Sequence, residues 1–385
     1  MDPARFRSSL LELALVFLKL GAIGFGGPAA HIALMETELV GRRRWLTRDQ
    51  FLDLVGAVNL IPGPNSTEVA IHAGRVRAGL AGLIVSGTAF IFPAFVVVTA
   101  IAWIYQRVGT LPQTVALLYG VKPVILAIVV HALIGLAHTA VKNVWLAIAG
   151  LAAFIVTLIR PSDELIVLLV MGVGAGLIAW WLSRLARSTA LGLSMPTLAV
   201  LAPSLVPTAP VVGHVPLGSL FLVFLKIGSV LFGSGYVLLS FLRADLVERL
   251  GWLTNAQLLD AIAVGQVTPG PLFTTATFIG YNLAGFWCAV VATVGIFLPA
   301  FVFVGLSAPL IPAMRRSRVT GAVLDAVNVA SVALMAAVTC TLAADALTDP
   351  LTVVVAIVSA VVLFRFRVDA TFLVIGGGVI GLLFR

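Results

Sequence analysis

Two lysines stand at equivalent places in long apolar stretches of the sequence. Lys19 lies in "FLKLGAIGFGGP", and Lys226 lies 207 residues further along in "FLKIGSVLFGSG". A cation at the centre of a membrane-spanning helix costs at least about 2.5–3.5 kcal/mol, so a cost that recurs in both stretches indicates a recurring use. We predict that the two ammonium groups contact an anion. The alternative is that each lysine lies near the end of a span and extends its ammonium group to the membrane surface.

A glycine-rich segment follows each lysine and is a poor continuous helix. We predict a break in the helix at both places, formed by Gly24, Phe25, Gly26, Gly27 and Pro28 in the first stretch and by Phe232, Gly233 and Ser234 in the second. Pro28 suits the first turn of a new helix, where its missing N–H costs nothing. The free N–H groups of such a helix start can bind an anion. Close packing between helices is the alternative role for these glycines.

A Pro-Gly-Pro motif follows each glycine-rich segment. Its residues are Pro62, Gly63 and Pro64 in "NLIPGPNSTE", and Pro269, Gly270 and Pro271 in "QVTPGPLFTT". Each proline disfavours helical geometry in the residue before it, so the motifs predict two further helix breaks that serve as hinges. The N-cap candidates after the first motif are Asn65, Ser66 and Thr67, and Thr274 offers a hydroxyl after the second. Four helix starts and two lysines that converge would suit a small, doubly charged anion.

Two titratable residues near the first-half breaks are candidates for proton coupling. His31 follows Pro28 by three residues and can titrate near neutral pH, although its counterpart in the second stretch is Leu238. Glu68 lies in the first turn of the helix expected after the Pro-Gly-Pro motif.

The other acidic residues carry weaker signals. We interpret Glu36, Glu38 and Asp245 as residues near the membrane surface. Asp53 and Asp260 fall on an amphipathic helix expected after each "WLT", where a solvated or packing role and a mechanistic role both stay open. The sequence shows no metal-ligating constellation, no cofactor motif and no nucleophile–base arrangement, so it gives little support to an enzyme.

The composition is that of a polytopic membrane protein. Hydrophobic residues make up 61% of the 385 residues and charged residues only 10%, whereas soluble domains carry about 25% charged residues. Apolar runs of about 20 residues, long enough to cross a bilayer, recur along the chain. The arginines cluster in short loops, which is typical of the cytoplasmic loops of a membrane protein and not of a nucleic-acid-binding protein. Cys288 and Cys340 lie in apolar spans, so neither a disulfide nor a redox role is expected.

The chain divides into two homologous halves. "WLT" occurs at 45–47 and 252–254, and "PAFV" at 93–96 and 299–302. We therefore predict a first repeat over 1–187, a proline-rich connecting segment over 188–216 and a second repeat over 217–385. Arginines precede the span at about 78–105 in the first half but follow the equivalent span at about 285–308 in the second.

This reversal predicts that the halves cross the membrane in opposite directions. Inverted repeats with a binding site at their interface are a common plan among transporters. The reversal requires an odd number of crossings within about 188–214, a region whose prolines make it a poor helix former.

These motifs resemble the chromate ion transporter family, in its long-chain form with two homologous domains. The resemblance rests on "FLKLGAIGFGGPAAHIALME" at 17–36, "NLIPGPNSTEVAIHAG" at 59–74 and their counterparts "FLKIGSVLFGSG" and "QVTPGPLFTTATFIGY", and it extends over nearly the whole chain outside the connecting segment. It implies export of chromate across the cytoplasmic (inner) membrane, chromate resistance and halves in opposite orientations. The second half departs from the pattern because it lacks the equivalents of Pro28 and His31.

The residues alone indicate a tetrahedral dianion, and only the resemblance indicates chromate. Sulfate has a similar size and charge, so a carrier of sulfate or another oxyanion stays open, as do an anion channel and a membrane scaffold. The expected partners are chromate or sulfate and the lipid bilayer, with a homodimer as a candidate assembly. We expect no nucleic acid, cofactor or metal.

Overall fold

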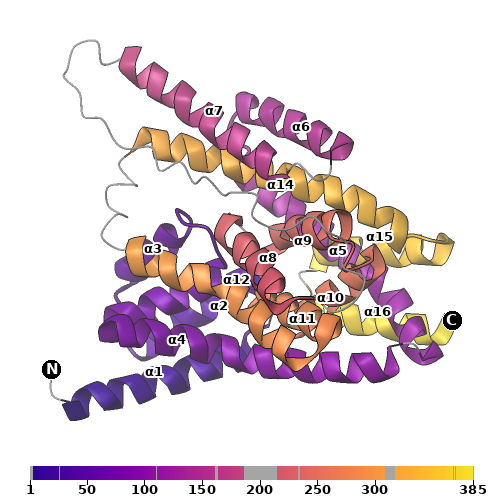
Figure 1. The fold of residues 1–385 in the computed structure, drawn as a ribbon, viewed down its shortest axis with the longest axis horizontal. Coiled ribbons are helices and arrows are strands. Elements are labelled where there is room, and N and C mark those ends of the chain that lie inside the picture. The colour runs from indigo at the N-terminus through magenta and orange to yellow at the C-terminus, as the bar shows by residue number, and fades with distance from the viewer. Residues whose placement is uncertain are drawn as a thin grey trace.

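The structure is a computed structural model, and every regular element that it describes is a helix (Figure 1). It describes residues 3–25, 27–109, 111–160, 164–185, 215–232, 235–307, 317–366, 368 and 370–384. Three residues of the predicted breaks, Gly26, Gly233 and Ser234, lie outside the described residues, as does the connecting segment up to residue 214. Within the described ranges, the prediction of an all-α protein is confirmed.

The two halves have corresponding elements in the same order, although two helices of the first half are divided into shorter ones in the second. The first half has α1 (Pro3–Ile23), α2 (Gly27–Glu36), the π-helical turn η1 (Thr37–Arg42), α3 (Arg48–Val58), α4 (Asn65–Val108), α5 (Pro112–Ala140), α6 (Val144–Ile159) and α7 (Glu164–Leu185). The second half has α8 (Leu217–Val230), η2 (Gly235–Val237), α9 (Leu238–Leu242), η3 (Arg243–Arg249), α10 (Asn255–Val267), η4 (Leu272–Thr274), α11 (Thr275–Ala284), α12 (Phe286–Ser307), α14 (Arg318–Ala346), α15 (Pro350–Phe366) and α16 (Ala370–Phe384).

All four predicted helix breaks are present. In the first half, helix stops between α1 and α2 and again between α3 and α4, at the glycine-rich segment and the Pro-Gly-Pro motif. In the second half, the equivalent gaps lie between α8 and η2 and between α10 and η4. Pro28 is the second residue of α2, where its missing N–H costs little.

The helices that follow the two "WLT" motifs begin with matching capping boxes. The Thr47 hydroxyl accepts from the Gln50 backbone N–H, and the Gln50 side chain accepts from the Thr47 N–H. Thr254 and Gln257 repeat both bonds at the start of α10. Such reciprocal bonds satisfy two backbone donors that a helix start leaves free, which explains why the same residues recur in both halves.

The long helix α4 is two helices joined by a kink. Ala78 and Gly79 have non-helical backbone angles, and Gly79 has a φ of 63°. In the second half the equivalent chain reversal falls at Gly285, with a φ of 82°, between α11 and α12. A positive φ suits glycine because it has no Cβ. The part of α4 after the kink and α12 correspond to the spans predicted at about 78–105 and 285–308.

The two halves are interlaced. α5 of the first half packs against α15 and α16 of the second, and α14 of the second half packs against α6 and α7 of the first. At the α5–α16 contact, a Cβ on Gly120 would lie 1.9 Å from the carbonyl oxygen of Gly377. Small residues allow such close approach of helix backbones in membrane proteins.

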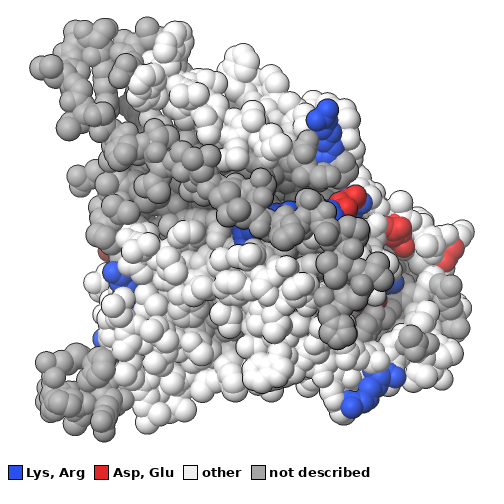
Figure 2. Space-filling view, in the orientation of Figure 1, with Lys and Arg blue, Asp and Glu red and all other residues white. Residues whose placement is uncertain are grey.

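The surface is that of a multi-pass membrane protein. Among the described residues, α4, α5, α12 and α14 are long and apolar enough to cross a bilayer. Large apolar side chains such as Trp145 on α6 and Phe372 on α16 are exposed, at 78% and 70% of their area. Most of the described side chains on the face in Figure 2 are uncharged. Lipid, unlike water, covers such a face favourably.

Candidate functional site

Two backbone hydrogen bonds cross between the halves and join the four breaks. The N–H of Gly63 donates to the carbonyl of Leu231 at 2.8 Å, and the N–H of Gly270 donates to the carbonyl of Gly24 at 2.7 Å. Gly63 and Gly270 are equivalent positions, and so are Gly24 and Leu231. Each Pro-Gly-Pro motif is therefore tied to the glycine-rich break of the other half, in a pattern with two-fold symmetry.

Glycine is required at the centre of both Pro-Gly-Pro motifs. Gly63 and Gly270 have φ values of 143° and 97°, in a region that residues with a Cβ rarely adopt. A Cβ on Gly270 would also lie 2.7 Å from the Cβ of Ala94 on α4. These glycines let the breaks approach the opposite half closely.

The helix starts after the Pro-Gly-Pro motifs have no side-chain cap. The expectation that Asn65, Ser66 or Thr67 caps α4 is wrong, because the helix already begins at Asn65 and Pro64 occupies the capping position without a side-chain bond. Pro271 holds the same position before η4, also without a side-chain cap. The Ser66 hydroxyl is instead in contact with His31. Backbone N–H groups of the first turn are thus left without a side-chain acceptor, as an anion site requires.

His31 bridges the two breaks of the first half. Its Nε2 lies 2.9 Å from the carbonyl oxygen of Gly24, and its Nδ1 lies 3.3 Å from the hydroxyl of Ser66. A neutral ring that donates from Nε2 and accepts at Nδ1 satisfies both contacts. The equivalent residue in the second half, Leu238, is buried and has no polar side chain to make such a bridge. The two halves therefore differ at this position.

Several predicted site residues lie at the breaks in different surroundings. Phe25 is 41% exposed, whereas Thr67 and Thr274 are buried. The Thr274 hydroxyl donates to the carbonyl of Pro271 at 2.8 Å. The Thr67 hydroxyl, by contrast, has no hydrogen-bond partner among the described residues. The Asn65 amide donates to the side-chain oxygen of Asn59 at 2.9 Å.

Both lysines pair with a carboxylate that lies 19 residues further along the chain. The Lys19 ammonium is 3.3 Å from Glu38, and the Lys226 ammonium is 2.6 Å from Asp245. The two carboxylates are almost covered, with side chains 8% and 6% exposed. This pairing was not predicted from the sequence, although the equal spacing of 19 residues in both halves indicates it. Among the described residues, no ion pair or hydrogen bond joins the two lysines or ties either ammonium to the breaks.

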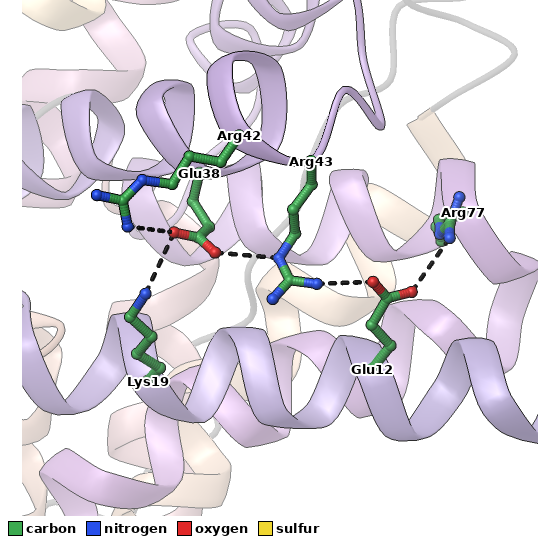
Figure 3. A network of polar contacts seen from close by, with 6 residues as sticks. All are labelled: Glu12, Lys19, Glu38, Arg42, Arg43 and Arg77. Atoms are coloured by element: carbon green, nitrogen blue, oxygen red, sulfur yellow. Dashed lines mark hydrogen bonds and ion pairs between the residues drawn. The ribbon is translucent and has the colours of Figure 1, made fainter.

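Each lysine–carboxylate pair belongs to a larger network. Arg42 binds Glu38 at 3.4 Å and the equivalent Arg249 binds Asp245 at 2.9 Å, each one helical turn after the carboxylate. In the first half the network continues, and Figure 3 shows Arg43 between Glu38 and Glu12, with Glu12 also bound by Arg77. Burial acts to raise the pKa of Glu38, but its bonds with Arg43 and Lys19 outweigh burial and lower that pKa.

A third cluster joins the halves at a point that the sequence did not indicate. The hydroxyl of Tyr105 on α4 donates to Asp260 on α10 at 2.8 Å, and the Lys122 ammonium on α5 lies 3.4 Å from the same carboxylate. Asp260 is 5% exposed. The amphipathic helix expected at Asp260 is present, but the buried contacts of Asp260 with Tyr105 and Lys122 were not predicted.

The breaks are closely packed in this conformation. A cavity of about 10 Å³ beside the second-half breaks is lined by Gly235, Gln266, Leu272 and Thr275 among others. A space of that size holds about one water molecule and is too small for a tetrahedral oxyanion. No group of three or more potential metal ligands occurs in the ranges that the structure describes.

The repeated halves and their symmetric breaks match a known family. The family model described as "Chromate transporter" matches residues 11–180 and again residues 218–382. The chain belongs to the chromate transporter family. The resemblance that the motifs indicated is thereby confirmed.

Three curated members of the chromate transporter family are similar over most of this chain. The chromate transport protein of Cupriavidus metallidurans is 30% identical over 378 residues, which cover 97% of this chain and 93% of that protein. The chromate transport protein of Pseudomonas aeruginosa is 33% identical over 85% of this chain and 79% of its own. A probable chromate transport protein of Synechococcus elongatus is 30% identical over 92% and 89%. No solved structure matches the chain significantly.

Proposed function

We propose that this protein exports chromate across the cytoplasmic membrane and confers resistance to chromate. Membership of the chromate transporter family and the names of its relatives support chromate as the substrate. The exposed apolar helices support a site within a bilayer. The direction of transport follows from the charge of the substrate and the polarity of the membrane.

The observation that carries the proposal is the pair of crossed hydrogen bonds, Gly63 to Leu231 and Gly270 to Gly24. They bring four chain breaks from both halves to one region within an apolar fold. Backbone that leaves the helix at membrane depth occurs where it is buried in protein or lines a polar cavity. The proposed donors lie along 24–29, 64–67, 232–235 and 271–274, and Gly63 and Gly270 act as hinges with their flanking prolines.

The lysines supply positive charge next to this region. Lys19 precedes Gly24 by five residues, which corresponds to about 7 Å along a helix. In the proposed bound state, the dianion becomes a partner of Lys19 and Lys226 beside Glu38 and Asp245.

The membrane potential is sufficient to drive export. A potential of 100 mV is worth about 2.3 kcal/mol per charge, hence about 4.6 kcal/mol for a dianion that leaves an inside-negative cell. At about 1.4 kcal/mol per decade, this corresponds to a gradient of roughly a thousandfold.

Alternating access follows from the proposed inverted arrangement of the two repeats, 1–187 and 217–385. The closed packing at the breaks represents one state of this cycle, and separation of a Pro-Gly-Pro motif from the opposite half opens the site. A rocking motion of one repeat against the other around a fixed site is a known mode of transport.

Uptake of radiolabelled chromate into inside-out vesicles tests the function. An imposed potential, positive inside the vesicle, should drive saturable accumulation, and preloaded chromate should accelerate uptake by exchange. A channel would show no such acceleration. Inhibition by low concentrations of sulfate would identify a general oxyanion carrier, whereas weak inhibition supports chromate as the substrate. Absence of accumulation under the potential would refute the proposal.

A further inference from the structure

Glu68 is a fully buried acid that the proposed function does not use. It lies in the first turn of α4, and its exposed fraction is 0%. Neither carboxylate oxygen has a hydrogen-bond partner among the described residues. An ionised carboxylate in an apolar interior without a partner costs far more than a neutral carboxylic acid. Glu68 is therefore held in its protonated form in this conformation.

The Glu68 carboxyl group lies against the Pro-Gly-Pro break. A Cβ on Gly63 would be 2.4 Å from the Glu68 Oε1, and 3.5 Å from the Cβ of Ala300 on α12 of the other half. The same Gly63 donates its N–H across the interface to Leu231. A change in the charge of Glu68 would therefore act on the hydrogen bond from Gly63 to Leu231, which is one of the two crossed contacts that close the site.

The second half shows that this position does not need an acid for packing. Thr275 is the equivalent of Glu68, it is also buried, and its hydroxyl donates to the carbonyl of Leu272 at 2.8 Å. A small neutral side chain that satisfies itself locally therefore fits the repeat. A buried acid in only one half indicates a use beyond the fold, because intramembrane acids are expensive and mark functional sites.

No described side chain forms a hydrogen bond with the Glu68 carboxyl group. On α4 itself, His72 follows one turn later and Arg75 donates to the carbonyls of Val304 and Gly305. The charged or titratable side chains described on the elements that pack against α4 are Glu12 and Lys19 on α1, His31 and Glu36 on α2, Arg48, Asp49 and Asp53 on α3, Asp260 on α10, Tyr281 on α11 and Cys288 on α12. None of them donates a hydrogen bond to the Glu68 carboxyl group.

His31 is less suited to carry a proton. Both ring nitrogens already contact the chain, at Gly24 and Ser66. A second proton on the ring would break the acceptor role of Nδ1 and would place a charge between the two breaks. Of the two candidates that the sequence offered, the contacts of His31 therefore favour Glu68.

We propose that Glu68 carries one proton across the membrane in exchange for each exported dianion. This inference rests on the proposed function and adds a driving force to it. With the crossed contacts closed, the carboxylic acid keeps its proton. When Gly63 separates from Leu231 and water enters from the cytoplasmic side, the O–H bond breaks, the proton passes to water, and the carboxylate takes up a proton again from the outer side.

The test uses inside-out vesicles with the potential held at zero. A lumen that is more acidic by one pH unit should sustain about a tenfold accumulation of radiolabelled chromate, because one pH unit on one proton is worth about 1.4 kcal/mol. Glu68→Gln and Glu68→Thr, the latter copying the second half, should reduce this ratio to about one. Both should keep chromate–chromate exchange at equal pH within about twofold of the unmodified protein. Glu36→Gln, at an ion pair with Arg48, is the matched control and should behave as unmodified.

Three results would overturn this inference. The first is gradient-driven accumulation in Glu68→Gln equal to that of the unmodified protein, which would also assign the effect to protonation of chromate itself. The second is potential-driven uptake by the unmodified protein with no response to the pH gradient. The third is loss of exchange in both Glu68 variants, which would show that Glu68 is needed to move the dianion itself and not only to carry a proton. Failure of the proposed function is distinct, because the unmodified protein would then show no potential-driven uptake at all.

Discussion

The backbone N–H of Gly270 donates a 2.7 Å hydrogen bond to the carbonyl oxygen of Gly24, and these two glycines belong to different halves of the chain. Gly63 and Leu231 form the same contact with the halves exchanged. The closed site is thus an interface between repeats, and each repeat contributes one Pro-Gly-Pro motif and one glycine-rich break to it.

Gly270→Ala should destabilise the closed state and slow transport. The φ of 97° disfavours any residue with a Cβ, and the added methyl group would lie 2.7 Å from Ala94. Backbone strain of this kind costs about 1–3 kcal/mol. We expect a lower melting temperature in detergent and a lower rate of chromate uptake. Gly218→Ala is the control, since its Cβ meets nothing within 4 Å. Equal melting temperatures for the two variants would argue against a tight fit at Gly270.

Asp245→Asn should weaken the fold and strengthen substrate binding. Asp245 is nearly buried and holds Lys226 at 2.6 Å and Arg249 at 2.9 Å. Loss of its charge leaves two cations poorly paired, at a cost of about 1–3 kcal/mol. The freed lysine should then attract chromate more strongly, so KM for uptake should fall severalfold while the melting temperature also falls.

A double-mutant cycle separates the ion pair from other effects of these changes. Asp245→Asn, Lys226→Gln and the double variant should show a coupling of about 0.5–3 kcal/mol in unfolding free energy, as expected for residues in direct contact. A rise in KM for Asp245→Asn would contradict the role of Lys226 as a contact for the dianion.

Much of the site could be predicted from composition and local chemistry. The four breaks follow from glycine and proline, whose backbone preferences are local, and the repeated "WLT" segments gave the helices α3 and α10, although not the capping boxes with which they begin. The partners of the breaks could not be predicted, because the bond from Gly270 to Gly24 depends on how the halves pack. The N-cap expectation failed because α4 begins earlier than expected, at Asn65, with Pro64 in the capping position.

Gly377→Ala should loosen the contact between α5 and α16. A Cβ at Gly377 would lie 2.5 Å from the Val124 side chain and 2.6 Å from the carbonyl of Gly120, whereas a Cβ at the adjacent Gly376 meets nothing within 4 Å. Overpacking of this kind typically costs 1–3 kcal/mol. The melting temperature should therefore fall for Gly377→Ala and stay within about a degree or rise for Gly376→Ala, because alanine favours helix. The same loss in both variants would mean that helix flexibility, not the interlaced packing, sets stability.

His31→Leu should separate the two first-half breaks. Leucine copies the second half at Leu238 but leaves the carbonyl of Gly24 without its His31 donor and the Ser66 hydroxyl without its His31 contact. The Gly24 carbonyl still accepts from the Gly270 N–H, so the loss falls mainly on the Ser66 hydroxyl. An unsatisfied buried polar group costs about 1–3 kcal/mol, so the variant should melt earlier and transport more slowly. His31→Gln, which can still donate to Gly24, should recover part of both losses. No difference between the two variants would show that the bridge is dispensable.

The lysine–carboxylate pairs mark the limit of sequence reasoning at this site. Glu38 precedes the arginines at 42–44, so its neighbours in the sequence suggest a loop at the membrane surface. In the fold, η1 instead lies close to α1, and the Glu38 carboxylate contacts the Lys19 ammonium group. The equal spacing of 19 residues in both halves indicates the two pairs. Charge alone does not show which residues the tertiary fold brings together.

Potential-driven chromate uptake by Lys19→Gln and Lys226→Gln tests the central claim most directly. Inside-out vesicles that carry each variant would be compared with the unmodified protein and with Lys142→Gln, whose lysine binds Asp325 in an exposed ion pair. We expect each of the first two substitutions to reduce accumulation at least tenfold, while Lys142→Gln leaves it unchanged. Uptake by Lys19→Gln and Lys226→Gln equal to that of the unmodified protein would contradict a dianion site built from both repeats.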